Sequence, residues 1–159
     1  MEKLLKIPYT VFNKNWNLLQ QFLDRRGNPK YELVGDVKLL NRKDIFDLGN
    51  LVRVYGDLDL FISSIQSLGS LEYVGGDLNL NATPIQSLGS LEYVGGDLTL
   101  DGTPIQTLGS LRYVGGDLDL RDSPIESLED LEYVGGTFYL SEDHQIPEEQ
   151  LTKFEVEYW

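Results

Sequence analysis

Residues 68–87 read LGSLEYVGGDLNLNATPIQS, and this twenty-residue block returns almost unchanged in the next two stretches of the chain. Residues 88–107 read LGSLEYVGGDLTLDGTPIQT, and residues 108–127 read LGSLRYVGGDLDLRDSPIES. Looser copies lie at residues 48–67 and from Leu128 onward, and a partial copy covers residues 33–47. A fixed period of this size is typical of a solenoid, in which each unit buries its apolar side chains against its neighbours. The sequence therefore predicts a stack of similar turns.

Within one repeat, the alternation of apolar and polar residues predicts a short strand. Leu78 and Leu80 flank Asn79, which places both leucines on one buried face. The preceding pair Gly75-Gly76 is interpreted as a turn with positive φ, and Pro84 ends the strand region. Too few residues remain for a full helix, so we expect 3₁₀ turns or extended chain on the return path.

Stacking the repeats places identical apolar residues in columns, and we expect these columns to be buried. About six large apolar side chains per turn, each worth about 1.5–3 kcal/mol when buried, offset the ordering of a repeat only when neighbouring repeats cover it. The strands are expected to form one narrow parallel sheet of six or seven strands, and the recurring tyrosines to stack along one edge. The columns are Leu58, Leu78, Leu98 and Leu118; Leu60, Leu80, Leu100 and Leu120; Ile65, Ile85, Ile105 and Ile125; and Tyr73, Tyr93, Tyr113 and Tyr133.

This pattern resembles the leucine-rich repeat family, whose short segment runs L-x-x-L-x-L-x-x-N-x-L. Residues 78–85 match its second half, with Thr83 at the asparagine position and Ile85 at the last leucine. The first leucine of the segment falls on Gly75, and threonine or serine replaces the asparagine in every repeat, so an asparagine ladder is absent. A threonine or serine hydroxyl can still bond the backbone at this turn. The variant with GGDLxL and TPI is similar to short repeat proteins of bacteria and their phages, and distantly to the receptor L-domain type.

The resemblance covers residues 33–146 and implies an α/β fold, a right-handed solenoid of horseshoe shape with a narrow parallel sheet. We expect one domain over residues 1–159, with an amino-terminal helical cap at 1–32 and a carboxyl-terminal helix–strand cap at 147–159. The first cap is predicted to contain a helix near residues 11–26, because Phe12, Trp16, Leu19 and Leu23 share one helical face; Thr10 or Asn13 is its candidate N-cap. In the second cap, alternation through Val156 and Tyr158 predicts a last strand about one repeat after residues 138–140.

Composition limits the classes of partner. The chain has 159 residues with 26 acids and 13 bases, a formal net charge of −13. Residues 1–47 carry nine bases and six acids (+3), whereas residues 48–159 carry four bases and twenty acids (−16). This balance disfavours direct binding to nucleic acid or to an anionic membrane, and it favours a protein partner that is basic. The chain has no cysteine, and its first residues do not resemble a secretion signal, so we expect a cytoplasmic protein.

The candidate partner-binding residues are the outward positions of the predicted sheet, where the repeats differ while the buried columns stay constant. Variation on a rigid frame is typical of a binding surface, and drift at positions free of packing constraint would produce the same pattern. Aromatic anchors often dominate interface energies, so Phe61 and Tyr139 are the first candidates. The predicted site comprises Lys38, Leu40, Asp59, Phe61, Asn79, Asn81, Thr99, Asp101, Asp119, Arg121 and Tyr139.

A further column places an aspartate directly before each strand, at Asp36, Asp57, Asp77, Asp97 and Asp117. Carboxylates about 5 Å apart repel by about 3 kcal/mol at an effective dielectric near 20, so something must compensate for this repulsion. Two interpretations stay open: each carboxylate accepts backbone N–H bonds, or the column forms a negative rail that holds cations or imitates phosphates. The calcium-loop patterns are missing, so no metal is predicted.

No residue pattern predicts catalysis. His144 is the only histidine, and no nucleophile stands in a recognisable relation to a base. We therefore expect no enzyme activity and no cofactor, and we predict a protein–protein interaction module that is monomeric or weakly self-associating. Two alternatives remain: an acidic decoy that inhibits a basic nucleic-acid-binding protein, as small phage-encoded inhibitors do, and a structural component of an assembly.

Overall fold

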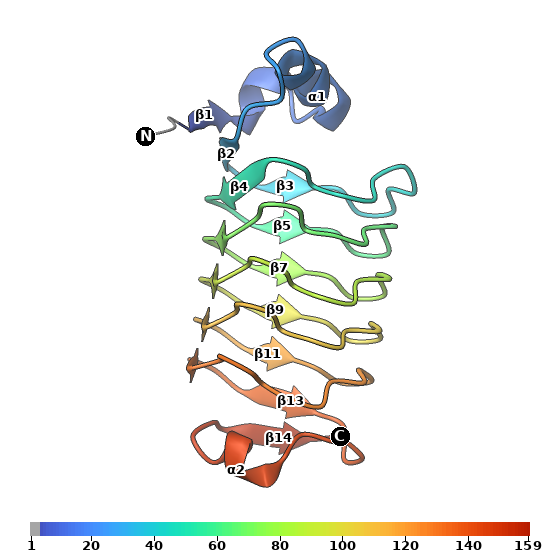
Figure 1. Cartoon of the computed structure of the whole chain (residues 1–159), viewed down its shortest axis with the longest axis vertical. Coiled ribbons are helices and arrows are strands. Elements are labelled where there is room, and N and C mark those ends of the chain that lie inside the picture. Colours follow the sequence, from blue (N-terminus) through green and yellow to red (C-terminus); the bar gives the residue numbers. More distant parts are fainter. Residues whose placement is uncertain (1–3) are drawn as a thin grey trace.

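The computed structural model describes residues 4–159 and shows a parallel-strand β-solenoid of about six turns with few helices (Figure 1). Its strands form two parallel sheets of seven strands each within this range. Sheet A consists of β1 (Leu5–Pro8), β2 (Tyr31–Val34), β4 (Leu51–Val54), β6 (Tyr73–Val74), β8 (Tyr93–Val94), β10 (Tyr113–Val114) and β12 (Tyr133–Val134). Sheet B consists of β3 (Val37–Lys38), β5 (Leu58–Asp59), β7 (Leu78–Asn79), β9 (Leu98–Thr99), β11 (Leu118–Asp119), β13 (Phe138–Leu140) and β14 (Val156–Tyr158).

Each repeat contributes one strand to each sheet, and the Gly-Gly pair forms the corner between them. The sequence predicts only sheet B, because the Leu-x-Leu alternation is visible there. In sheet A a single valine alternates with a tyrosine, which is too short a pattern to identify a strand. The register between complete repeats is twenty residues: Leu78 lies opposite Leu98, and Tyr73 lies opposite Tyr93.

The core is the set of leucine, isoleucine and valine columns that the two sheets enclose. The three predicted apolar columns are fully buried, with exposed fractions of 0–1%. Val74, Val94 and Val114 bury a further column from sheet A. At the position where the leucine-rich repeat segment has asparagine, the Thr83 and Thr103 hydroxyls each donate a 2.7 Å hydrogen bond to the carbonyl three residues earlier, as predicted for this turn.

The Gly-Gly corner is required by close packing between turns, and the prediction that it needs positive φ is wrong. Neither glycine of the pairs at 75–76, 95–96 and 115–116 has positive φ. A Cβ on Gly115 would lie 2.1 Å from the Gly95 carbonyl oxygen, and one on Gly116 would lie 2.0 Å from Asp97 Oδ1. Positive φ occurs instead just after sheet B, as at Gly102 (φ 68°) and Ala82 (φ 55°).

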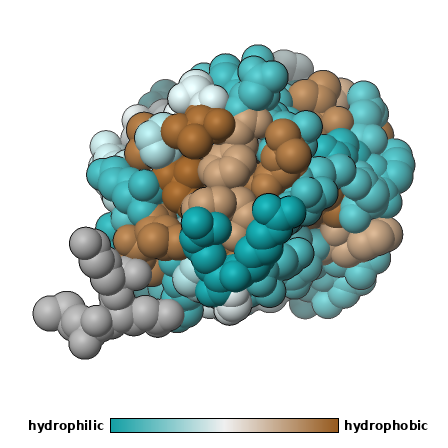
Figure 2. All heavy atoms as spheres, turned by 90° about the horizontal axis from the view of Figure 1, so that it is seen from above, coloured by the Kyte–Doolittle hydropathy of each residue, from teal (hydrophilic) through white to brown (hydrophobic). Residues whose placement is uncertain are grey.

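The amino-terminal segment contains the expected helix in a shorter form. The segment consists of the 3₁₀ helix η1 (Tyr9–Phe12) and the α-helix α1 (Trp16–Asp24). The two are separate because Asn13 and Lys14 between them adopt left-handed φ. The N-cap is Asn15, whose side chain accepts the Leu18 N–H at 3.1 Å, instead of the predicted Thr10 or Asn13. Trp16, Leu19 and Leu23 are buried, as the helical pattern predicts. Figure 2 looks down on this end and shows apolar side chains gathered there; Val11 and Leu18 are the exposed ones of η1 and α1.

The carboxyl-terminal segment adds the predicted last strand. The helix α2 (Glu148–Leu151) precedes β14, in which Val156 lies opposite Phe138 of β13. In the view of Figure 1 the turns stack in a straight column, with α1 above the first turn and α2 below β12. No helix within residues 4–159 is both long enough and apolar enough to cross a bilayer.

Two alanine substitutions separate close packing from backbone strain. Gly115→Ala forces a methyl group into the Gly95 carbonyl, so we expect a loss of at least about 3 kcal/mol of unfolding free energy. Gly102→Ala meets no atom within 4 Å and suffers only from its left-handed backbone, which predicts a loss of about 1 kcal/mol. Urea unfolding followed by circular dichroism measures both losses. Equal losses for the two variants would contradict the packing explanation of the corner.

Candidate interaction surface

Sheet B places the predicted partner-binding residues in two adjoining columns on its outer side. The first column lies within the strands and continues by register from one turn to the next. It comprises Lys38, Asp59, Asn79, Thr99, Asp119 and Tyr139. The second column lies two residues further along each turn and comprises Leu40, Phe61, Asn81, Asp101 and Arg121. The structure therefore brings all eleven predicted residues to one side of the stack, six in the strands of sheet B and five in the turns that follow these strands.

The amino-terminal part of this surface carries exposed apolar side chains. Leu40 is 41% exposed and Phe61 is 37% exposed, so neither is buried beneath the amino-terminal segment. The third residue of the predicted apolar patch, Ile62, is half-buried and has a φ of 57°, which is unusual for a β-branched residue. The apolar contribution of this region therefore comes mainly from Leu40 and Phe61.

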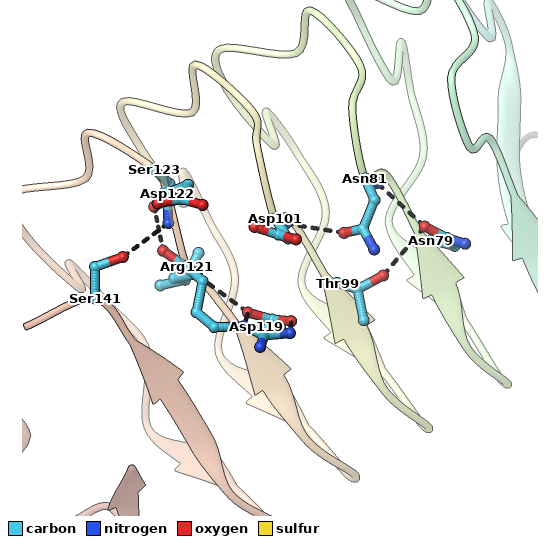
Figure 3. Close-up of polar contacts among 10 residues, drawn as sticks. Asn79, Asn81, Thr99, Asp101, Asp119, Arg121, Asp122, Ser123 and Ser141 are labelled. Carbon is cyan, nitrogen blue, oxygen red and sulfur yellow. Dashed lines mark hydrogen bonds and ion pairs between the residues drawn. The ribbon is translucent and has the colours of Figure 1, made fainter. Parts of the chain in front are cut away.

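The middle of the surface is a network of short polar side chains, drawn in Figure 3. Thr99 Oγ1 lies 3.2 Å from Asn79 Oδ1 on the neighbouring turn, and the Asp101 backbone N–H donates to Asn81 Oδ1 at 2.8 Å. Asn79 Oδ1 also accepts the Asn81 backbone N–H at 3.1 Å. These bonds between neighbouring turns hold the polar side chains in place, so this part of the surface is rigid.

A charged and aromatic cluster occupies the carboxyl-terminal part of the surface. Arg121 forms a bidentate pair with Asp119, with Nε–Oδ1 at 2.9 Å and Nη2–Oδ2 at 2.6 Å. Its guanidinium carbon lies 5.6 Å from the ring centroid of Tyr139 and 5.3 Å from that of Trp159. This pairing balances the charge of Arg121 locally. Asp119 is only 6% exposed, so this cluster presents Arg121 and the rings of Tyr139 and Trp159 to a partner.

The pKa values of Asp101 and Arg121 are both raised in this region, for different reasons. Partial burial raises the pKa of Asp101 above its ordinary value of 3.8, and the nearby Asp119 carboxylate raises it further, while Arg121 opposes the shift. The hydrogen bond to Asp119 raises the pKa of Arg121, so its positive charge is fixed. This part of the surface therefore combines Arg121, which stays protonated, with Asp101, whose ionised form is disfavoured by burial.

The aspartate column forms a series of backbone caps, as the first of its two interpretations predicts, and its members other than the half-buried Asp117 remain exposed. Asp77 Oδ1 accepts the backbone N–H of Asp97 on the next turn at 2.8 Å, and Asp97 Oδ1 accepts that of Asp117 at 2.8 Å. The same bond repeats along the whole column, from Asp36 to Thr137, at 2.8–2.9 Å. Each carboxylate thus has a charge-assisted bond to an N–H that the corner leaves unpaired. Across residues 4–159, no group of three or more potential ligands is arranged to hold a metal ion.

Sheet A presents a ladder of tyrosines on its outer side. Tyr73, Tyr93 and Tyr113 stack with ring centroids 4.8 and 4.7 Å apart and planes within 4° of each other, as the recurring tyrosines predict. Tyr133 extends the stack at 4.8 Å, and burial raises the pKa of Tyr93. Because the rings pack against one another, they leave mainly their edges for a partner.

The one histidine takes part in a structural contact. His144 Nδ1 accepts the Ile146 backbone N–H at 3.1 Å, and its ring stacks on Tyr158 with centroids 5.6 Å apart. Its Nε2 lies 3.8 Å from the exposed Glu148 carboxylate. These contacts help the last turn to hold its shape, and only 9% of the His144 side chain is exposed.

Two residues of the surface were not included in the predicted set. Glu157 of β14 lies opposite Tyr139 and extends the first column, and Trp159 extends the second. The twenty-residue period could not locate them, because β14 follows β13 by eighteen residues. The alternation of acidic and apolar residues from 154 to 158 was the available signal.

The chain was also compared with known proteins. No family model, no curated protein and no solved structure matches it.

Replacing one capping carboxylate tests the aspartate column. Asp97→Ala removes the acceptor of the Asp117 N–H, and we expect a loss of about 1–2 kcal/mol of unfolding free energy. Asp97→Asn keeps an acceptor oxygen and removes one of the repeated charges, so its loss should stay below about 0.5 kcal/mol. Urea unfolding at pH 7 measures both variants. An asparagine variant that loses as much as the alanine variant would show that the charge matters more than the cap.

The raised pKa of Asp101 predicts a pH-dependent effect. Because its pKa in the folded state exceeds the ordinary 3.8, folding disfavours the ionised form; the stability is greatest below 3.8 and decreases as the pH rises through the folded pKa. Asp101→Asn should therefore raise the unfolding free energy at pH 7 by up to about 1 kcal/mol. The difference from wild type should vanish towards pH 3. Thermal unfolding between pH 3 and 7 measures it, and a gain that is constant with pH would disprove the assignment.

Proposed function

We propose that this protein is a non-enzymatic interaction module that binds one protein partner on the outer side of sheet B. The observation that supports this proposal is the contrast between the columns of that sheet. In the four turns from β5 to β11 the inward residue is always a fully buried leucine, whereas its outward neighbour is in turn Asp59, Asn79, Thr99 and Asp119. A rigid frame with a variable outer face is the arrangement that repeat proteins use for recognition.

The chemistry of the two ends of this face suggests where the binding energy lies. Phe61 and Leu40 offer an apolar contact at one end, and Tyr139 beside Arg121 offers an aromatic and cationic contact at the other. Phe61 and Tyr139 lie on turns four apart, which corresponds to about 19 Å at the ordinary strand spacing. Aromatic and arginine side chains are the residues that most often dominate interface energies, and the polar middle would supply specificity.

The proposal extends to the overall shape of the solenoid and to the role of its two ends. We regard the chain as a relative in shape of leucine-rich repeat proteins, with η1–α1 and α2–β14 acting as caps on the two ends of one domain. Burial of Trp16, Leu19 and Leu23 at one end, and of Ile146 and Leu151 at the other, supports the capping role. With the core covered at both ends, the outer sides of the sheets and the outer edge of β14 remain free to bind.

Removing the two aromatic anchors tests the proposed face. Affinity capture from a lysate of the native host, quantified by mass spectrometry, compares wild type with the double variant Phe61→Ala/Tyr139→Ala. Specific partners should fall at least about 30-fold, which corresponds to a loss of about 2 kcal/mol for a pair of interface anchors. Tyr133→Ala, which removes an exposed aromatic on sheet A, is the matched control and should retain them. Capture of the same partners by the double variant would disprove binding on this face.

A second candidate is an acidic decoy that inhibits a basic nucleic-acid-binding protein. The observation that favours it is the −16 charge of residues 48–159, with exposed carboxylates such as Asp77, Glu92 and Asp97 repeated along the stack. Ionic strength separates the two functions: a decoy complex should weaken more than about tenfold between roughly 50 and 300 mM salt, whereas an apolar-anchored complex should change little. Titration of the captured partner at both salt concentrations provides the measurement.

A further inference from the structure

The last strand of sheet B leaves one edge unpaired within the described chain. On its inner edge β14 bonds β13: the Phe138 N–H donates to the Glu155 carbonyl at 2.8 Å, and the Trp159 N–H donates to the Leu140 carbonyl at 2.9 Å. Val156 and Tyr158 lie opposite Phe138 and Leu140, and in a parallel strand alternate residues bond opposite neighbours. The N–H and carbonyl groups of Val156 and Tyr158 therefore point away from β13, towards the side on which sheet B has no further strand within residues 4–159.

The other three sheet ends differ from this one. At β1, the edge residue Pro8 has no N–H to donate. At β3, the residues of the edge share a hollow with Tyr9 and Lys14, which places the η1 region beside that edge. At β12, α2 lies against the same turn, where Gln150 Oε1 accepts the Leu128 N–H at 2.8 Å. We therefore consider β14, whose outward N–H groups belong to the half-buried Val156 and the exposed Tyr158, rather than β1, where Pro8 interrupts the row of donors that Lys6 begins.

The side chains around this edge define the chemistry of an occupant. Val156 is half-buried and Tyr158 is 44% exposed, so an apolar strip lies beneath the unpaired backbone. Glu155 and Glu157 alternate with them on the outer side and are exposed. Residues 141–159 contain six acids and one lysine. A second copy of β14 would bring acid against acid, whereas a basic strand would pair with these charges.

We propose that β14 is a strand-addition site for an extended peptide segment in which basic and apolar residues alternate. The segment pairs in parallel with Val156 and Tyr158 and continues sheet B by one strand. Its apolar side chains cover Val156 and Tyr158, and its basic side chains lie next to Glu155 and Glu157. Trp159, which is 60% exposed, offers a ring to one of the cations. This site lies at the end of the proposed docking face and shares Glu157 and Trp159 with it, but it rests on the backbone edge of β14 and does not depend on binding at that face.

A backbone substitution in β14 tests strand addition directly. The probe is fluorescein-labelled Lys-Val-Lys-Val-Lys-Val with an amidated carboxyl end, titrated by fluorescence anisotropy at about 100 mM salt. Tyr158→Pro removes an N–H that bonds nothing in β13, and Tyr158→Val is the control for the lost ring. We expect the proline variant to bind at least tenfold more weakly than the valine variant. Equal affinities for the two variants would overturn the proposal.

Modified peptides keep the test valid if the proline variant unfolds, since they use the wild-type protein. In parallel pairing the lysine N–H groups face β14, so methylation of the lysine backbone nitrogens should abolish binding. Methylation of the valine nitrogens should abolish binding only in the antiparallel arrangement. Loss with the lysine-methylated peptide alone supports parallel strand addition, and loss with the valine-methylated peptide alone or retained binding with both overturns it.

Charge variants separate local recognition from general attraction to an acidic protein. Glu155→Lys/Glu157→Lys should weaken binding of the lysine peptide at least tenfold. The matched control Glu72→Lys/Glu92→Lys changes the net charge equally on the side of sheet A and should bind within twofold of wild type. If both double variants weaken binding equally, the peptide is held only by the overall charge of the protein. If sedimentation shows dimers that depend on β14, a second copy of the chain occupies the edge. Either result overturns the proposal.

Discussion

The close approach of backbone to backbone between successive turns is the constraint on which this fold depends. Parallel hydrogen bonding fixes neighbouring strands about 4.8 Å apart, so every side chain must fit beneath its own counterpart on the next turn. At the Gly-Gly corners of the complete repeats from residue 95 onward there is no room for a side chain at either position. A Cβ added to Gly116 would lie 2.0 Å from Asp97 Oδ1, which explains why the Gly-Gly pair recurs. Because of this spacing, equivalent residues of successive turns form columns, and the contacts between neighbouring members of each column have to be favourable.

The columns solve this requirement in different ways. Leucines and isoleucines gain by stacking because they bury one another. Tyrosines gain by ring stacking at 4.7–4.8 Å. Aspartates alone would repel, and they are tolerated because each one accepts the backbone N–H of the next turn. The aspartate thus recurs because its carboxylate accepts a backbone N–H that would otherwise lack a hydrogen-bond partner. No ligand is needed to explain these acids.

Much of the fold was predictable from the sequence because a strict period converts directly into register. The buried columns, the last strand and the tyrosine stack all follow from residues that recur at fixed spacing. Sheet A was not predictable, since Tyr73 and Val74 alone give no alternation, and the role of Gly75-Gly76 depends on atoms of the preceding turn. Among the candidate partner-binding residues, the outward positions followed from alternation. The pairing of Arg121 with Asp119 and the placement of Trp159 beside it depend on side-chain geometry that spacing does not contain.

The tyrosine ladder has a consequence for how such a protein can grow. Successive rings from Tyr73 to Tyr113 deviate by only 3–4° from parallel, so neighbouring turns are hardly rotated with respect to one another. Insertion or deletion of one whole repeat would then leave every later outward residue pointing in its former direction. The length of the outer face is therefore adjustable in steps of one turn by gene duplication, with no redesign of the interior.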